Sequence, residues 1–401
     1  MSAITQPLPT AGLAAPASHA QAASRLPWHC FAVVLAALCI PIGVIWDISW
    51  HETIGRDTFW TPAHMMIYLG GALPGMLCGA LVIQQTFWPR PGEPEALVRL
   101  WGFRGSFGGW VCIWGSLAML VSAPFDNWWH DAYGLDVQIL SPPHSLLALG
   151  MYGVAIGAML LILAWRNRAE PGQQAIANTL FFLSCGTLVT MVTVFILEMT
   201  FPNHQHGAEF YRAVCVTAPF FPVAASRATG LRWAATAAAG IYMLIAALML
   251  WILPLFPAHP MLGPIYNPVT HMVPEPFPLL TVFPALALDL LLRALGRGRG
   301  FWRDTALALL LGAAFFLVFL AVQWPFATFQ LSPAARNPFF GGDMMWDYNA
   351  SLGDWNHQFW ERKGEVLDVL TLRAGAVAAG LAAVQCRLAL AFGNWMAGVK
   401  R

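Results

Sequence analysis

The fold is decided by the stretch FAVVLAALCIPIGVIWDISWHETIGRDTFWTPAHMMIYLGGALPGMLCGALVI, residues 31–83. Two apolar runs flank a polar segment that begins at Asp47 and ends at His64. Each run is long enough to cross a hydrocarbon layer of ~30 Å at ~1.5 Å per residue. Backbone groups in lipid must be hydrogen-bonded within the chain, so both runs are predicted to be helices. The stretch therefore predicts a membrane-embedded helical hairpin with its polar turn at one surface.

The same character extends along the whole chain. Of its 401 residues, 58% are hydrophobic and 10% are charged, whereas a soluble domain carries roughly 25% charged residues. We expect an all-α, polytopic transmembrane helix bundle of about ten helices, multi-pass in a cell inner membrane and surrounded by the lipid bilayer. The formal net charge of +1 gives no indication of nucleic-acid binding. The predicted helices cover residues 28–48, 63–88, 104–124, 143–165, 175–198, 209–226, 232–255, 277–296, 302–325 and 365–390.

The domain organisation follows from composition. Residues 1–24 are rich in Ala, Pro and Ser and are predicted to be a flexible cytoplasmic tail. A signal peptide is disfavoured because the first apolar segment is too long and ends in acidic sequence. Residues 25–401 are predicted to form a single transmembrane domain. Its seven cysteines lie in or beside apolar segments without a CxxC pair, so neither disulfides nor thiolate metal sites are expected.

Charge sets the expected orientation. If the chain crosses ten times, most of its basic residues fall on one side: Arg25, Arg90, Arg99, Arg104, Arg166, Arg168, Arg227, Arg232, Arg293, Arg297, Arg299, Arg303, Lys400 and Arg401. The positive-inside rule makes that side cytoplasmic, with both termini inside. The opposite side collects most of the acidic residues and nine of the eleven histidines. A set of polar sites is therefore expected at the extracytoplasmic surface.

Two outer segments resemble each other. Trp46–His64 reads WDISWHETIGRDTFWTPAH, and Phe125–His144 reads FDNWWHDAYGLDVQILSPPH. Both contain Asp-x3-His-x3-Gly-x-Asp followed by Ser/Thr-Pro-x-His, with one extra residue in the second. Each spans the turn of a predicted hairpin, at residues 28–88 and 104–165. The pattern predicts an internal repeat with two equivalent sites.

The repeated residues suit a metal ion. Asp47 and His51, like Asp126 and His130, are four residues apart and share a helix face if the helix extends that far. The N-cap residues Thr61 and Ser141, each followed by proline, would place His64 and His144 in the first turn of the returning helix. One carboxylate and two imidazoles suit Cu(II), Fe(II) or Zn(II). The alternative is that these side chains hydrogen-bond to one another and cap helices. The predicted metal ligands are Asp47, His51, His64, Asp126, His130 and His144.

The two triplets resemble the metal-binding motifs of the C subunit of the copper-dependent membrane monooxygenases, the particulate methane and ammonia monooxygenase family. In that family Asp-x3-His-x12-His is a copper site, and Asp47, His51 and His64 have this spacing. A second family site, Asn-x3-His-x13-His, matches Asp126, His130 and His144 in spacing, with Asp126 in place of asparagine. The resemblance covers about residues 30–165. It implies a copper protein, and further monooxygenase-type subunits as partners for oxygen-dependent hydroxylation of a small apolar substrate.

Two other hypotheses remain open from the sequence. One is a non-enzymatic carrier or chaperone for copper or another divalent cation, although a transporter should carry polar ligands at mid-membrane depth. The predicted helix interiors are nearly free of charge, with Asp289 and Arg373 as exceptions. The other is a structural scaffold with interfacial polar networks. The remaining outer histidines are expected mainly in structural or interfacial roles: His204, His206, His259, His271 and His357.

Overall fold

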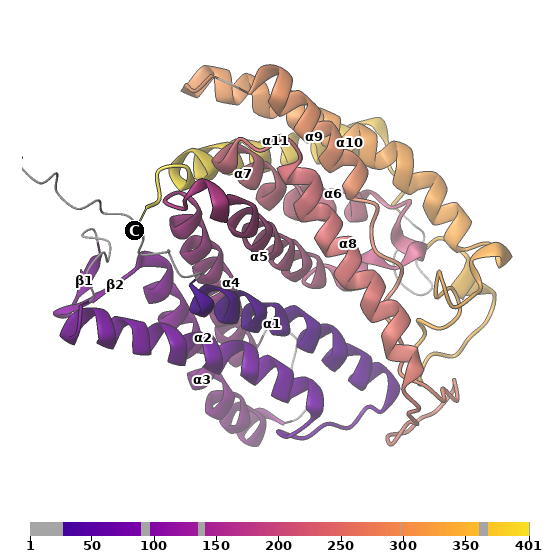
Figure 1. Cartoon of the computed structure of the whole chain (residues 1–401). Helices are drawn as coiled ribbons and strands as arrows, with labels where there is room; N and C mark the ends of the chain where they lie inside the picture. The colour runs from indigo at the N-terminus through magenta and orange to yellow at the C-terminus, as the bar shows by residue number, and fades with distance from the viewer. Residues whose placement is uncertain (1–26, 90–96, 135–140, 297, 361–367, 401) are drawn as a thin grey trace, which may run out of the picture.

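The fold is described from a computed structural model covering residues 27–89, 97–134, 141–296, 298–360 and 368–400. Eleven α-helices and one two-stranded antiparallel hairpin make up the regular structure of this described part. In Figure 1 the helices α1 to α3, in indigo and purple, lie on one side of the bundle, and α9 to α11, in orange and yellow, lie on the other, with α5 and α8 between them. The all-α helix-bundle prediction is confirmed.

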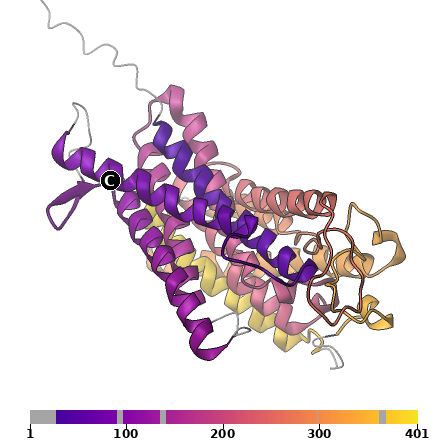
Figure 2. The same cartoon turned by 90° about the horizontal axis from the view of Figure 1, so that it is seen from below.

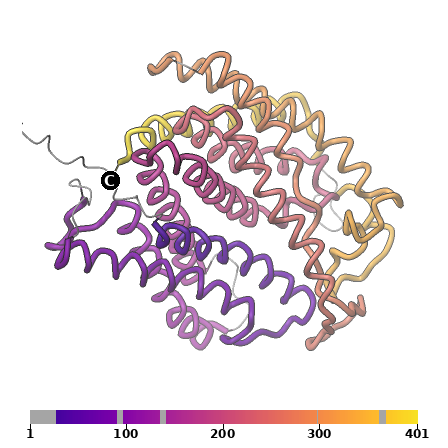
Figure 3. Tube along the Cα trace, in the orientation of Figure 1, coloured from indigo at the N-terminus to yellow at the C-terminus, as the bar shows by residue number. Residues whose placement is uncertain are grey.

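The elements follow one another along the chain with short connections in its first half. The helices and strands are α1 (Trp28–Thr53), α2 (Pro62–Phe87), β1 (Val98–Leu100), β2 (Phe103–Gly105), α3 (Phe107–Tyr133), α4 (Pro142–Arg166), α5 (Gln174–Val194), α6 (Ala208–Thr217), α7 (Phe220–Thr229), α8 (Ala234–Ile252), α9 (Val282–Leu295), α10 (Phe301–Gln330) and α11 (Leu372–Met396). Short 3₁₀ turns occur at η1 (Pro171–Gln173), η2 (Leu197–Thr200), η3 (Pro202–His204), η4 (Leu253–Leu255), η5 (Pro333–Ala335) and η6 (Asp354–His357). The trace in Figure 3 allows each connection to be followed.

Eight of the described helices are long and apolar enough to cross a membrane. They are α1, α2, α3, α4, α5 (with η1), α8, α10 and α11. The helix predicted at 209–226 is instead two short helices, α6 and α7, which are separated at Ala218–Pro219. Proline lacks the amide hydrogen that an uninterrupted helix requires at that position. The chain is a multi-pass membrane protein, and its sidedness remains a prediction.

Several predicted boundaries were wrong in an informative way. The first and third helices were predicted to end at residues 48 and 124, but α1 and α3 continue to Thr53 and Tyr133. The acidic and histidine residues at these ends were interpreted as loop, although the backbone there remains helical. The helix predicted at 277–296 begins only at Val282, because the proline-rich segment before it is extended. The last helix, predicted at 365–390, is shifted and covers Leu372–Met396.

Close helix contact fixes the two N-terminal hairpins. A Cβ atom added to Gly43 or Gly70 would collide with the facing helix of the α1–α2 pair. The same is true of Gly115 and Gly150 in the α3–α4 pair. Small residues at such positions let helix backbones approach closely in membranes. The outer ends of both hairpins are therefore held by tightly packed helices.

The exceptional charge Asp289 has a structural explanation. Its carboxylate accepts hydrogen bonds from the backbone amides of Ala235 and Thr236, at 3.1 and 2.8 Å, at the start of α8. The first amides of a helix have no partner within the helix, so a buried carboxylate stabilises that end. Arg373, the other exception, is exposed in the first turn of α11.

Candidate metal centres

The outer ends of the first two hairpins are built alike. Asp47 and His51 lie on the last two turns of α1, and Asp126 and His130 lie on the last two turns of α3. Gly55 and Gly134, four residues after each histidine, adopt positive φ angles of 80° and 95°. Glycine adopts this conformation without the steric penalty that other residues incur. The repeated glycine thus ends the helix one turn beyond the histidine and lets the chain return.

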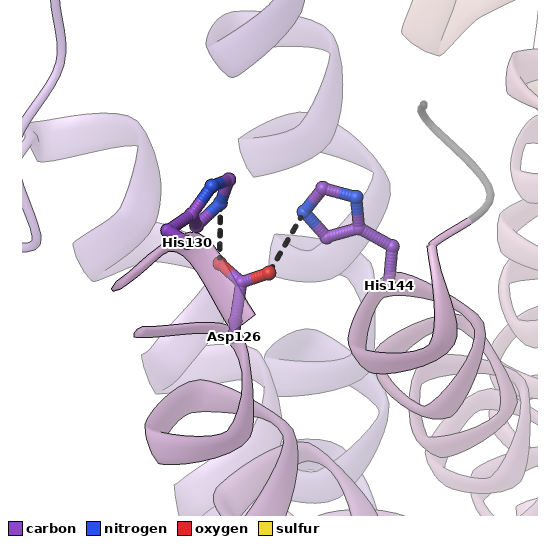
Figure 4. A group of neighbouring side chains, drawn as sticks. All are labelled: Asp126, His130 and His144. Carbon is purple, nitrogen blue, oxygen red and sulfur yellow. Dashed lines mark ion pairs between the residues drawn. The ribbon is translucent and has the colours of Figure 1, made fainter. Parts of the chain in front are cut away.

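The second hairpin brings three candidate ligands together. The Asp126 Oδ2 and Oδ1 atoms lie 3.4 Å from His130 Nε2 and 3.3 Å from His144 Nε2, respectively. Figure 4 shows the carboxylate between the two imidazole rings, with one oxygen directed at each. One ligand atom from each residue can be chosen so that all three lie within 4.8 Å of one another. Ligands bound at about 2.0–2.2 Å around a tetrahedral metal are separated by roughly 3.4 Å, so this group could hold a metal ion.

The first hairpin has a wider arrangement. Asp47 Oδ1 lies 3.1 Å from His64 Nε2, and Asp47 Oδ2 lies 3.9 Å from His51 Nε2. Among the described residues, only the ligand atoms of the second group, and not those of Asp47, His51 and His64, all lie within 4.8 Å of one another. The predicted residues nevertheless converge on one carboxylate, as they do in the second hairpin.

Asp57 is an additional acidic residue at the first hairpin. Its Oδ2 atom lies 3.5 Å from the Nε2 atoms of both His51 and His64. Asp57 therefore contacts the same two imidazoles as Asp47. It was not among the predicted ligands, although the repeated motif includes this aspartate and so contained the signal. The corresponding residue of the second motif, Asp136, lies outside the described residues.

Backbone carbonyls orient one histidine in each hairpin. His64 Nδ1 lies 2.9 Å from the Thr58 carbonyl oxygen, and His130 Nδ1 lies 3.3 Å from the Gly134 carbonyl oxygen. A carbonyl only accepts hydrogen bonds, so Nδ1 is assigned the hydrogen and Nε2 faces the carboxylate. Metal-bound histidines are commonly fixed in this way through their second nitrogen. When the ring is neutral, its Nε2 lone pair faces negative oxygen, an arrangement that a bound cation stabilises.

The aspartates share another feature. In both hairpins the aspartate Oδ1 atom is buried, and the nearest imidazole nitrogen belongs to His64 or His144. Buried polar atoms are normally hydrogen-bonded. A hydrogen on the imidazole nitrogen supplies this partner when the ring is protonated, and a cation between carboxylate and imidazole would supply it when the ring is neutral.

Thr61 and Ser141 both occupy the predicted N-cap positions, but only Ser141 caps its helix through the side chain. Ser141 accepts a hydrogen bond from the His144 amide and caps α4. Thr61 occupies the N-cap position of α2, but its hydroxyl forms hydrogen bonds with the Thr58 backbone instead. The turn before α2 folds back on itself, and this brings Thr58 within reach of His64. Both histidines lie in the first helical turn, as predicted.

Tyr68 interacts electrostatically with carboxylates of both sites. It is one turn beyond His64 on α2, with the two rings 6.1 Å apart. It is within electrostatic range of Asp47, Asp57 and Asp126. Because one side chain interacts with carboxylates of both hairpins, the two candidate sites are neighbours in the structure. This interaction was not predicted from the sequence, because Tyr68 lies beyond His64, where the repeated motif ends.

The other outer histidines make mainly structural contacts. His206 is stacked between Trp324 and Phe359, with ring centroids 3.7 Å from each, and burial lowers its pKa. His204 packs edge-on against Trp360. His271 and His357 each pair with one polar neighbour. The His271 ring is hydrogen-bonded to the Thr270 hydroxyl, and His357 Nε2 lies 3.6 Å from Asp343 Oδ1. His259 is exposed.

The chain was compared with protein families, curated proteins and solved structures. No protein-family model, no curated protein and no solved structure matches this chain.

Proposed function

We propose that this chain is a membrane metalloprotein that binds one copper ion at the outer end of each N-terminal hairpin. Asp126, His130 and His144 would hold one ion. Asp47, His51 and His64 would hold the other, with Asp57 as a further oxygen ligand. The observation that carries the proposal is the convergence of two imidazoles on a single carboxylate, with ligand atoms spaced as they would be around a metal.

Copper is proposed over iron and zinc on the spacing of the two triplets, which resembles that of the C subunit of the copper-dependent membrane monooxygenases. The ligand set itself accepts all three metals. In a catalytic version, together with partner subunits, the bound metal would supply oxygen activation for hydroxylation of a small apolar molecule. The chain's own residues would hold the ion, orient the imidazoles through Thr58 and Gly134, and admit an apolar molecule between lipid-facing helices.

A carrier or chaperone for copper is the second candidate. The observation that favours it is the accessibility of the ligands, because the side chains of His51 and Asp57 are 48% and 37% exposed. An ion at such a site can exchange with a soluble donor. Measuring whether bound copper transfers to a competing chelator on the timescale of minutes separates the carrier from a permanently metallated enzyme component.

The proposal is tested by metal analysis of the full chain purified in detergent and loaded with copper. We expect about two equivalents in the unmodified protein, about one in His51→Ala and in His130→Ala, and none in the double variant. Loss of a direct ligand should weaken binding by more than the ~10–100-fold typical of a second-shell change. His271→Ala is the matched control, since this exposed histidine lies on the same side and outside both groups.

Two results would contradict parts of this assignment. If either single variant loses all its copper, the two triplets form one shared centre. If the double variant retains both equivalents, these histidines only form ion pairs with the aspartates, and the metalloprotein proposal is wrong.

A further inference from the structure

A second polar region is packed against the last two turns of α1, beside the first hairpin. Between α8 and α9 the chain runs as an extended segment whose residues Met272–Pro276 are buried. The segment is tied to its neighbours: the Val273 amide donates to Thr53 Oγ1 at 2.7 Å, and the Leu279 amide donates to the Tyr242 phenol oxygen at 3.1 Å. Non-helical backbone within a membrane protein is tolerated where it is buried in protein or lines a cavity.

This segment does line a cavity. Its volume is about 30 Å³, which is room for one or two particles the size of a water molecule. The walls come from α1, α5, η2, α8 and the extended segment. The polar residues among them are Thr190, Thr193, Thr200, Tyr242 and Glu275.

Glu275 is the unusual member of this lining. Glu275 is only 6% exposed, and neither of its carboxylate oxygens has a hydrogen-bond partner. Burial raises the pKa of this carboxyl to about 8. Glu52 on α1 is close enough to repel it, and Asp347 in turn repels Glu52. A buried carboxylate without a partner is costly, so a positively charged occupant of the cavity would be strongly stabilised.

The threonines supply oxygen atoms with lone pairs, although the Thr193 oxygen also shares a hydrogen bond with the Tyr242 phenol. Thr190 and Thr193 donate their hydroxyl hydrogens to the carbonyls of Gly186 and Val189, each at 2.9 Å. Thr200 donates to the Leu197 carbonyl at 2.8 Å. With these hydrogens committed, the three hydroxyl oxygens can only accept. The lining therefore combines one carboxylate with several acceptor oxygens.

We propose that this cavity is a binding site for one small, hard monovalent cation, of the size of sodium, held by Glu275 and the hydroxyl oxygens of Thr190, Thr193 and Thr200. Hard cations prefer such oxygen ligands, and the absence of nitrogen and sulfur from the described lining distinguishes this site from the copper sites. A single lining carboxylate balances one charge. Extended backbone and carboxylates at breaks between helices bind sodium ions or protons in membrane transporters.

The test measures thermal unfolding of the full chain in detergent at pH 8.5, where Glu275 is largely ionised. Sodium chloride is compared with potassium chloride and choline chloride at equal ionic strength, without added copper. We expect the unfolding midpoint to rise saturably with sodium. Glu275→Gln should abolish this rise while preserving the shape of the side chain. Glu198→Gln is the matched control, because Glu198 is exposed on the neighbouring η2 turn.

A second variant guards against a folding defect in Glu275→Gln. Thr190→Val removes one oxygen whose only hydrogen bond is to the Gly186 carbonyl of its own helix, and it should weaken the apparent sodium affinity about tenfold while leaving the midpoint in choline nearly unchanged. Equal midpoints in all three salts would overturn the proposal. So would a sodium effect that survives in Glu275→Gln, or stability that depends on pH alone, which would make the proton the only occupant. None of these measurements depends on copper binding at the hairpins, so the sodium proposal can fail while the copper proposal stands.

Discussion

The first hairpin differs from the second in what covers its outer end. Beyond α1, the Tyr348 amide donates to the Glu52 carbonyl and the Met261 amide donates to the Ile54 carbonyl, at 3.0 and 2.9 Å. The loops 256–281 and 331–360, which both come from the second half of the chain, thus rest on this turn. At Gly134 in the second hairpin, no described atom lies within 4 Å of where a Cβ would be. Figure 2 shows the outer end of α3 apart from the orange loops.

This difference shows how one motif can serve two environments. Under the loops, the site of the first hairpin has a second described carboxylate, Asp57, and a wider separation of its ligands. In the second hairpin, the three described ligands lie close together, and one carboxylate contacts both imidazoles. Similar spacing in sequence therefore does not imply equal affinity or equal dependence on each ligand.

The largest expected effect separates the two aspartates. Asp126→Ala removes the carboxylate between both imidazoles, and we expect copper affinity at the second site to fall by more than ~100-fold. Asp47→Ala leaves Asp57 within reach of both imidazoles, so the copper affinity of the first site should fall by less than that of the second site in Asp126→Ala. Equilibrium competition with a chelator of known affinity measures both, with the other site disabled by a histidine variant.

The double variant Asp47→Ala/Asp57→Ala sharpens this comparison. With both carboxylates gone, the first site should lose copper as fully as Asp126→Ala does. If Asp47→Ala alone already equals Asp126→Ala, then Asp57 is not a ligand and the two hairpins are chemically equivalent. Asp136→Asn then becomes informative, because it tests whether the second motif uses its final aspartate in the way proposed for Asp57.

An intermediate effect is expected from the two glycines. Alanine at Gly134 meets open space and should lose roughly 1–3 kcal/mol, because its φ of 95° and ψ of 164° form a backbone conformation essentially restricted to glycine. Alanine at Gly55 incurs the same penalty and also overlaps the Tyr348 ring, which should add ~1–3 kcal/mol. Denaturant unfolding of the two variants in the same detergent measures the difference. Equal losses would show that Tyr348 moves away easily and that the cover over the first hairpin is loose.

The smallest expected effect concerns communication between the hairpins. Because Tyr68 is within electrostatic range of carboxylates at both, two Cu(II) ions should be near enough to broaden each other's electron paramagnetic resonance lines. Removing one ion with His130→Ala should narrow the spectrum of the other. Tyr68→Phe should retain two equivalents and the broadening, since the phenol is not a ligand. Unbroadened spectra at full loading would place the sites too far apart to interact.

Much of the architecture was available from the sequence, because apolar runs longer than a bilayer is thick have few alternatives to helices. The boundaries at Thr53 and Tyr133 were missed because polar residues at a membrane interface do not end a helix, whereas the positive φ of Gly55 and Gly134 does. The break at Pro219 was missed because the surrounding apolar composition is continuous. Orientation relative to the cytoplasm is still a prediction from charge.

The six predicted ligands were identified from spacing alone, since residues four apart on a helix and a histidine in the next first turn must meet when a hairpin closes. Only the tertiary structure decided the rest. It brought Asp57 against both imidazoles, Tyr348 over Gly55, and Tyr68 within electrostatic range of aspartates in both hairpins. It also buried Glu275 among threonines from distant helices. Some of these contacts join residues that are far apart along the chain, and others depend on a turn of irregular backbone. The periodicity of a sequence predicts neither kind of contact.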